Sequence, residues 1–179
     1  NTFYSAALPV MWPYNFSTQG RIIVSSVSGA TGVPRVSWQH GGGGSIAEVD
    51  DRGLLRVGPR SAGAMPGPAC YGQGGTKPTL TDANLVLGYL DAGFFLGGKM
   101  RLDKTAAENA IAEGVGKPLG LETLRAAWGI HDIICEDVAR AFRIHATERG
   151  FDYRNSSMVG FGGSGPLHAV SVARKLKIP

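Results

Sequence analysis

A glycine-rich turn late in the chain is the segment best suited to hold an anion. Residues 157–161 predict a short strand, residues 162–165 a turn, and residues 166–176 a helix with Pro166 in its first turn. Such a turn presents backbone N–H groups at a helix N-terminus, where the helix dipole favours negative charge. Four residues therefore form a candidate cradle for an anion or a nucleotide: Gly162, Gly163, Ser164 and Gly165. The alternative is a turn that only permits close helix packing.

The same segment also satisfies the G-x-G-x-x-G pattern of dinucleotide-binding proteins, from Gly160 to Gly165. That unit needs a second strand and an acidic residue about 20 positions later to hold a ribose. The residues that follow Gly165 in this sequence include neither. A dinucleotide site is therefore the weaker interpretation of these glycines.

A second glycine-rich segment begins at Gly41. Consecutive small residues can expose their N–H groups as a nest for a phosphate or a carboxylate. Three residues are the candidates for a phosphate or substrate loop: Gly43, Gly44 and Ser45. The alternative is a flexible connector between two strands.

Polar and nucleophilic residues accompany the helix expected after residue 80. Thr81 is the expected N-cap, and Asp82 and Asn84 could be polar ligands facing a cleft, although helix capping would also explain Asp82. Cys70 lies in a proline- and glycine-rich loop at 58–78, but no histidine is near it in sequence. A nucleophilic role for Cys70 is therefore disfavoured, and no catalytic residue is identified.

The histidines look isolated in the sequence. His168 falls in the first turns of the last helix without a visible partner, and His131 with Asp132 is expected to form a surface pair. The two cysteines, Cys70 and Cys135, have no C-x-x-C or Cys/His metal spacing. We therefore expect no metal site among these residues.

The coarse pattern predicts strands first and helices afterwards. Residues 21–24 and 35–38 read as strands, and residues 46–49 and 54–57 read as a hairpin. Asp103 is expected to start a helix that runs to residue 115. Residues 121–147 form a long helical segment, expected to bend or break near Gly129.

Composition narrows the function classes. The 179 residues carry 18 basic and 14 acidic side chains, giving a net charge of +4, and 43% are hydrophobic. The basic residues form no run, which argues against nucleic-acid binding. No stretch of 18 apolar residues occurs, so no membrane segment is expected. Two cysteines without a pairing pattern favour a cytoplasmic location.

Three ordered blocks carry a resemblance to a known family. They are Gly42 to Ala47 (GGGSIA), Gly58 to Gly88 (GPRSAGAMPGPACYGQGGTKPTLTDANLVLG) and Phe161 to Ala169 (FGGSGPLHA). The chain thereby resembles the hydantoinase A / 5-oxoprolinase family. The resemblance implies an α/β (α+β) chain that is part of an actin/hexokinase-like nucleotide-binding fold. It also implies ATP and Mg²⁺ as cofactors and ring opening of a cyclic amide such as a hydantoin or 5-oxoproline.

The resemblance also bears on organisation and partners. It assigns residues 41–179 to a partial hydantoinase A / oxoprolinase-like domain, while residues 1–40 read as poorly matching N-terminal strands. The family's acidic phosphate loops have no counterpart here, so the chain is expected to be an inner to C-terminal fragment of a larger subunit. A B-type partner subunit or a homo-oligomer is expected. The alternatives are a truncated, non-catalytic binding or scaffold module and a relative of the ATP-dependent ketone carboxylases.

Overall fold

The computed structural model describes residues 21–27, 36–41 and 44–178 of the chain. Its strands are β1 (Arg21–Val27), β2 (Val36–Gly41), β3 (Ser45–Val49), β4 (Leu55–Ser61) and β5 (Ser157–Phe161). Its α-helices are α2 (Leu80–Val86), α3 (Lys104–Ile111), α4 (Lys117–Leu119), α5 (Thr123–Glu148) and α6 (Gly165–Leu176). Single turns of 3₁₀-helix form at Ala69–Tyr71 and Tyr153–Asn155, and a π-helical turn at Ala112–Gly116 joins α3 to α4. The mixed fold predicted from the sequence is confirmed.

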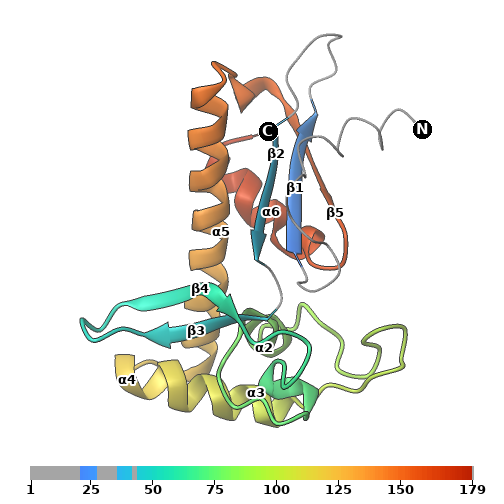
Figure 1. The fold of residues 1–179 in the computed structure, drawn as a ribbon, viewed down its shortest axis with the longest axis vertical. Coiled ribbons are helices and arrows are strands. Elements are labelled where there is room, and N and C mark those ends of the chain that lie inside the picture. Colours follow the sequence, from blue (N-terminus) through green and yellow to red (C-terminus); the bar gives the residue numbers. More distant parts are fainter. Residues whose placement is uncertain (1–20, 28–35, 42–43, 179) are drawn as a thin grey trace.

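Two antiparallel sheets lie along the long helix α5. The larger sheet has the order β2-β1-β5, so β5, from late in the sequence, pairs with β1, from early in it. The smaller sheet is the predicted hairpin of β3 and β4. Figure 1 shows the C-terminal part of α5 beside the larger sheet and its N-terminal part beside the hairpin. Helices α2, α3 and α4 lie near the N-terminal end of α5. The predicted boundary between residues 40 and 41 stays a prediction.

The core is built on one face of α5. Four of its fully buried side chains recur at helical spacing: Ile130, Ile134, Val138 and Phe142. This face packs against α2, α6, β2 and β4. The helix does not break near Gly129, because α5 is continuous through that residue; a bend there stays a prediction. Gly129 lies against the hairpin, where an added Cβ would come within 3.4 Å of Leu55 Cδ2.

The loop predicted at 58–78 begins later than expected, because residues 58–61 belong to β4, and the rest of it is held by close backbone contacts and hydrogen bonds. Gly75 lies so close to Gly67 O that any side chain at position 75 would overlap that oxygen. Cys70 N–H and Cys70 O are both used, the first by Asp82 and the second by Asp103 N–H at 2.8 Å. The loop is therefore tied to the starts of both α2 and α3.

Candidate functional site

The predicted nucleotide turn connects β5 to α6. Gly162 has a φ of 89°, a left-handed conformation that favours glycine. Gly162 and Gly163 are exposed, and an added Cβ at either would meet no atom of the described residues within 4 Å. Ser164 is the N-cap residue of α6 and makes no side-chain cap bond. The turn therefore leaves space above its backbone at the start of a 12-residue helix.

Gly160, in the same segment, is needed for a different reason. Its ideal Cβ would lie 2.8 Å from the Cβ of Ala169 on α6. Carbon atoms in ordinary contact are about 3.5–4.0 Å apart. Gly160 is thus required for close packing of β5 against α6, whereas Gly162 and Gly163 have no such neighbours in the part of the chain that the structure describes.

The second predicted loop is only partly described, since Gly43 lies outside the described residues. Gly44 O accepts from Ala62 N–H at 2.8 Å, and a Cβ on Gly44 would lie 2.8 Å from Ser61 Oγ. Ser45 is buried and pairs with Ser61 in the hairpin. Gly44 therefore contacts the loop after β4 and Ser45 contacts the end of β4 itself, and their role toward a phosphate or a substrate stays a prediction.

Asp82 organises the loop that precedes its helix. Its buried carboxylate accepts from Ala69 N–H, Cys70 N–H and Thr79 N–H at 3.3, 2.8 and 2.9 Å, and from the Thr79 hydroxyl at 2.7 Å. The expected N-cap at Thr81 was wrong. Thr79 is the N-cap and forms a capping box with Asp82, because Asp82 is the third residue of α2. Asp82 thus fastens residues 69–79 to the helix.

Cys70 lies beside this carboxylate and is fully buried. Burial, and next the negative charge of Asp82, raise the pKa of the Cys70 thiol well above its usual range. A nucleophilic cysteine needs a lowered pKa and access. This environment agrees with the expectation that Cys70 is not a nucleophile.

Asn84 belongs to a buried polar cluster with His131, Cys135 and His168. Asn84 Oδ1 lies 3.0 Å from His131 Nδ1, and Asn84 Nδ2 lies 3.4 Å from His168 Nε2. Cys135 Sγ lies 3.5 Å from His131 Nε2 and 3.4 Å from His168 Nδ1. The four side chains close a ring in which each one can donate once and accept once. This cluster, named here the His-Cys-His cluster, joins α2, α5 and α6.

Two sequence expectations are corrected by this cluster. His131 is completely buried rather than part of a surface pair, and His168 has partners from two other helices. The rings of His131 and His168 stack with centroids 4.5 Å apart. The signal in the sequence was the four-residue spacing of His131 and Cys135, which places them on one face of a helix.

Burial also fixes the protonation of the cluster. Desolvation lowers the pKa of His131, and desolvation together with the charge of His131 lowers the pKa of His168 to about 3. Desolvation raises the pKa of Cys135 to about 12. All three side chains are therefore neutral at neutral pH, which suits a closed ring of hydrogen bonds.

The structure connects one predicted ligand to the predicted nucleotide turn. Asn84 contacts His168, which lies in the first turn of the helix that Gly165 begins. Asp82, two residues before Asn84, bonds instead to the loop at 69–79. Asn84 therefore reaches α6, whereas Asp82 is engaged on the opposite side of α2.

Comparison with known proteins places the chain in a family. The Hydantoinase/oxoprolinase family profile matches residues 32–179. The chain is 47% identical over 147 residues to the caprolactamase subunit alpha of Pseudomonas jessenii, an alignment that covers 81% of this chain and 21% of that one. It is 51% identical over 128 residues to the acetophenone carboxylase gamma subunit of Aromatoleum aromaticum, covering 71% and 18%.

A solved structure supports the same placement. The structure of the ATP-dependent caprolactamase from Pseudomonas jessenii matches with a TM-score of 0.70 at 35% identity, covering 96% of this chain and 28% of that one. The chain belongs to the hydantoinase/oxoprolinase family. It spans about a fifth of the length of the curated relatives it matches. Within the described ranges, no helix has the length and apolar character needed to cross a bilayer.

Proposed function

We propose that this chain is part of an ATP-dependent enzyme that opens a cyclic amide such as a hydantoin or 5-oxoproline. ATP supplies the activation in this reaction: its γ-phosphoryl group is transferred to the amide oxygen and ADP leaves. Water then adds to the activated carbon, the ring C–N bond breaks, and inorganic phosphate departs. Activation is needed because an amide carbon is otherwise a poor electrophile.

The observation that carries this proposal is the turn between β5 and α6. Gly162 and Gly163 leave an exposed backbone surface before a helix N-terminus, which is the arrangement that accepts a nucleotide. Its position in a chain related to an ATP-dependent caprolactamase favours ATP over a dinucleotide. In this proposal Gly162, Gly163, Ser164 and Gly165 contact the nucleotide.

Mg²⁺ would accompany ATP because phosphoryl transfer requires neutralisation of the phosphate charge. Mg²⁺ prefers carboxylate and water oxygens. Among the residues that the structure describes, the one group of three potential metal-binding side chains contains histidine and cysteine rather than carboxylates. We therefore assign the Mg²⁺ ligands to other parts of a longer protein.

A second reaction is favoured by one observation. The identity of 51% over 128 residues to a subunit of acetophenone carboxylase is slightly higher than the 47% over 147 residues to the caprolactamase subunit. ATP-dependent carboxylation of a ketone would also use a nucleotide turn. The third alternative is a module that binds or scaffolds without turnover.

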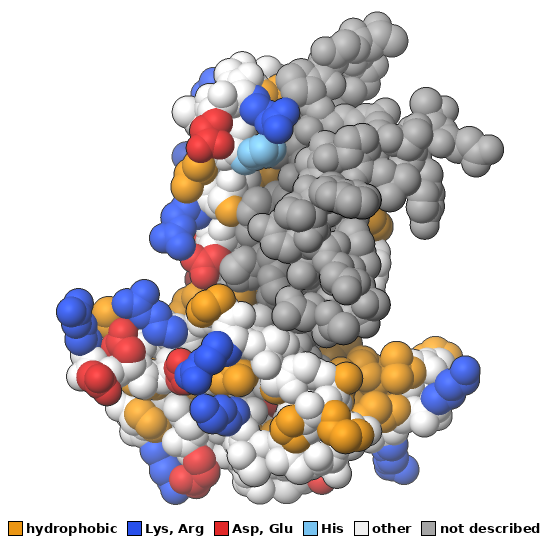
Figure 2. All heavy atoms as spheres, in the orientation of Figure 1, with side chains coloured by type: hydrophobic (Ala, Val, Ile, Leu, Met, Phe, Trp, Pro, Cys, Tyr) orange, Lys and Arg blue, Asp and Glu red, His pale blue; other side chains and the backbone are white. Residues whose placement is uncertain are grey.

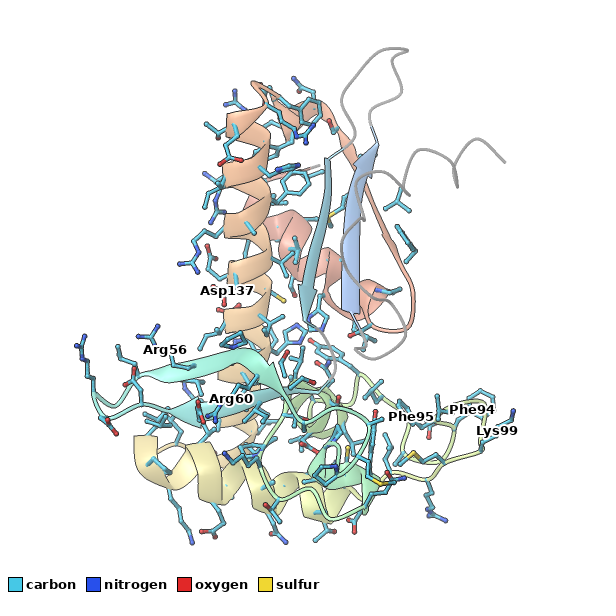
Figure 3. All side chains as sticks on the ribbon, in the orientation of Figure 1. Arg56, Arg60, Phe94, Phe95, Lys99 and Asp137 are labelled. Atoms are coloured by element: carbon cyan, nitrogen blue, oxygen red, sulfur yellow. The ribbon has the colours of Figure 1, made fainter. Side chains whose placement is uncertain are left out.

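Partner subunits are part of the proposal, since both relatives are named as subunits. The loop at residues 91–100 presents Phe94 and Leu96, which are 69% and 64% exposed, while Phe95 packs against Tyr71. Figures 2 and 3 show this loop projecting from the body, with apolar side chains gathered on it and Lys99 near its tip. Exposed apolar residues of this kind suit contact with a B-type subunit or another copy.

The proposed location is the cytoplasm, because the two free, buried thiols fit a reducing compartment.

The test is calorimetric titration of the folded chain with ATP and Mg²⁺, compared with a Gly163→Val variant. The variant adds a side chain to the proposed nucleotide surface at a position where a Cβ meets no atom of the described residues within 4 Å, so its fold should be unchanged. Thr105→Val, at an exposed position on α3, is the matched control for adding an apolar side chain.

Binding that Gly163→Val weakens at least tenfold and Thr105→Val leaves unchanged would support the nucleotide turn. Equal binding by all three proteins would place the nucleotide elsewhere. ATP-dependent release of phosphate with a hydantoin or 5-oxoproline, measured with the partner subunit present, would then separate ring opening from ketone carboxylation and from a non-catalytic module.

A further inference from the structure

We propose that His131, Cys135 and His168 form a binding site for a divalent metal ion of the zinc class. Neither the sequence pattern nor the ATP chemistry accounts for two histidines and a thiol gathered at full burial. The three ligand atoms, His131 Nε2, Cys135 Sγ and His168 Nδ1, lie within 4.8 Å of one another. The proposal is independent of the function proposed above.

The distances to the sulfur fit a tetrahedral ion. Zn²⁺ binds sulfur at about 2.3 Å and histidine nitrogen at about 2.0–2.1 Å, so tetrahedral geometry places these atoms roughly 3.5 Å apart. Cys135 Sγ lies 3.5 Å from His131 Nε2 and 3.4 Å from His168 Nδ1. Each sulfur–nitrogen distance therefore matches that of two atoms bound to one ion. The two nitrogens, which lie within 4.8 Å of each other, would have to come to roughly 3.4 Å, so binding requires the stacked rings to turn.

The ligands are positioned by two packed helices. His131 and Cys135 are one turn apart on α5, and His168 comes from α6, which packs against that face. Fixed helices hold ligand geometry better than loops do. Three protein ligands leave a fourth position for water or another small molecule, as in catalytic zinc sites.

Metal binding would change the protonation of the cluster. Histidine coordinates in its neutral form and cysteine as its thiolate. The Cys135 thiol loses its proton to solvent as the sulfur–metal bond forms, without any change of oxidation state. Metal affinity should therefore rise with pH.

Asn84 is a hydrogen-bond partner for one proposed ligand, His131, at the ring nitrogen that does not face the metal. When His131 binds through Nε2, its Nδ1–H donates to Asn84 Oδ1 at 3.0 Å, the support that metal-bound histidines usually have. His168 bound through Nδ1 would carry a proton on Nε2, which lies 3.4 Å from Asn84 Nδ2. One amide oxygen serves one histidine only, whereas the carboxylate of an Asn84→Asp variant could accept from both.

The cluster lies one aromatic layer below the surface. The rings of Tyr89 and Trp128 contact His131 at centroid distances of 5.0 and 5.7 Å. Tyr89 is 41% exposed and Trp128 is 47% exposed. Movement of either ring would open the cluster to ions from solvent.

The experiment is titration of the reduced, chelator-treated chain with Co²⁺, a spectroscopic substitute for Zn²⁺. One Co²⁺ per chain with a near-ultraviolet sulfur-to-Co²⁺ charge-transfer band is expected, and Zn²⁺ should displace it. Cys135→Ser should abolish the band, whereas Cys70→Ser, at an equally buried cysteine outside the cluster, should retain it. His168→Gln should weaken binding at least tenfold, and Asn84→Asp should tighten it.

A folded wild-type chain without the band would overturn the proposal, as would a band that survives Cys135→Ser or disappears in Cys70→Ser. Circular dichroism establishes folding of each variant. X-ray absorption of the Zn²⁺-loaded wild-type chain does not depend on any variant. One sulfur neighbour is expected, and a shell of nitrogen and oxygen alone would contradict the site.

Discussion

His131 on α5 and His168 on α6 stack with their ring centroids 4.5 Å apart and their planes 19° from parallel. Two stacked imidazoles cannot both carry a proton at low cost, because burial and mutual repulsion disfavour the charged forms. Each ring is instead connected to Cys135 and to Asn84. The contact between α5 and α6 therefore depends on two neutral histidines.

The metal-free chain should lose stability in mild acid for this reason. Well above pH 6.5, His168 is neutral in both the folded and unfolded states, so it imposes no pH dependence there. As the pH falls from 6.5 toward 3, the unfolded state binds a proton that the folded state refuses. The cost at pH 5 is about 2 kcal/mol of unfolding free energy.

Chemical denaturation at pH 7.5 and pH 5 measures this difference. His168→Gln should remove much of the acid sensitivity, and His145→Gln, at a histidine outside the cluster, should retain it. An acid sensitivity that is the same in wild type and His168→Gln would mean that other groups cause it.

Asp82→Ala should be strongly destabilising. The substitution leaves three backbone N–H groups and the Thr79 hydroxyl without their acceptor in a buried site. The expected loss is about 3 kcal/mol or more. Asp103→Ala is the matched control, because Asp103 caps α3 through one exposed bond to Ala106 N–H and should cost about 1 kcal/mol. Equal losses in urea denaturation would show that Asp82 is an ordinary cap.

The secondary-structure elements could be predicted from the sequence better than the side-chain contacts between them. The hairpin, β5, the glycine turn and α6 were predicted because alternation, glycine and proline act locally. The N-cap was placed two residues late, since Thr79 and Thr81 are equally good caps and the choice depends on Asp82 reaching Cys70 N–H. The His-Cys-His cluster was missed because its members come from α2, α5 and α6, and only tertiary packing brings them together.

Gly160→Ala and Gly163→Ala should separate packing from ligand contact in the glycine turn. A methyl group at 160 would lie 2.8 Å from Ala169 Cβ, so β5 and α6 must move apart, at a cost of about 1–3 kcal/mol. A methyl group at 163 meets nothing within 4 Å among the described residues and should change stability by less than about 0.5 kcal/mol. Thermal unfolding of both variants measures this, and a larger loss at 163 than at 160 would reverse the assignment.

Neither cysteine should react with a thiol reagent while the chain is folded. Cys70 and Cys135 are fully buried, and burial raises the pKa of both thiols, that of Cys135 to about 12. The thiolate is the reactive form, so both exclusion and protonation suppress the reaction at neutral pH. An aromatic disulfide reagent should detect no thiol in native buffer and two in denaturant.

If one native thiol reacts quickly, the Cys70→Ser and Cys135→Ser variants identify it. Rapid reaction of Cys70 would restore the nucleophile reading, whereas rapid reaction of Cys135 would show that Tyr89 and Trp128 admit solvent to the cluster.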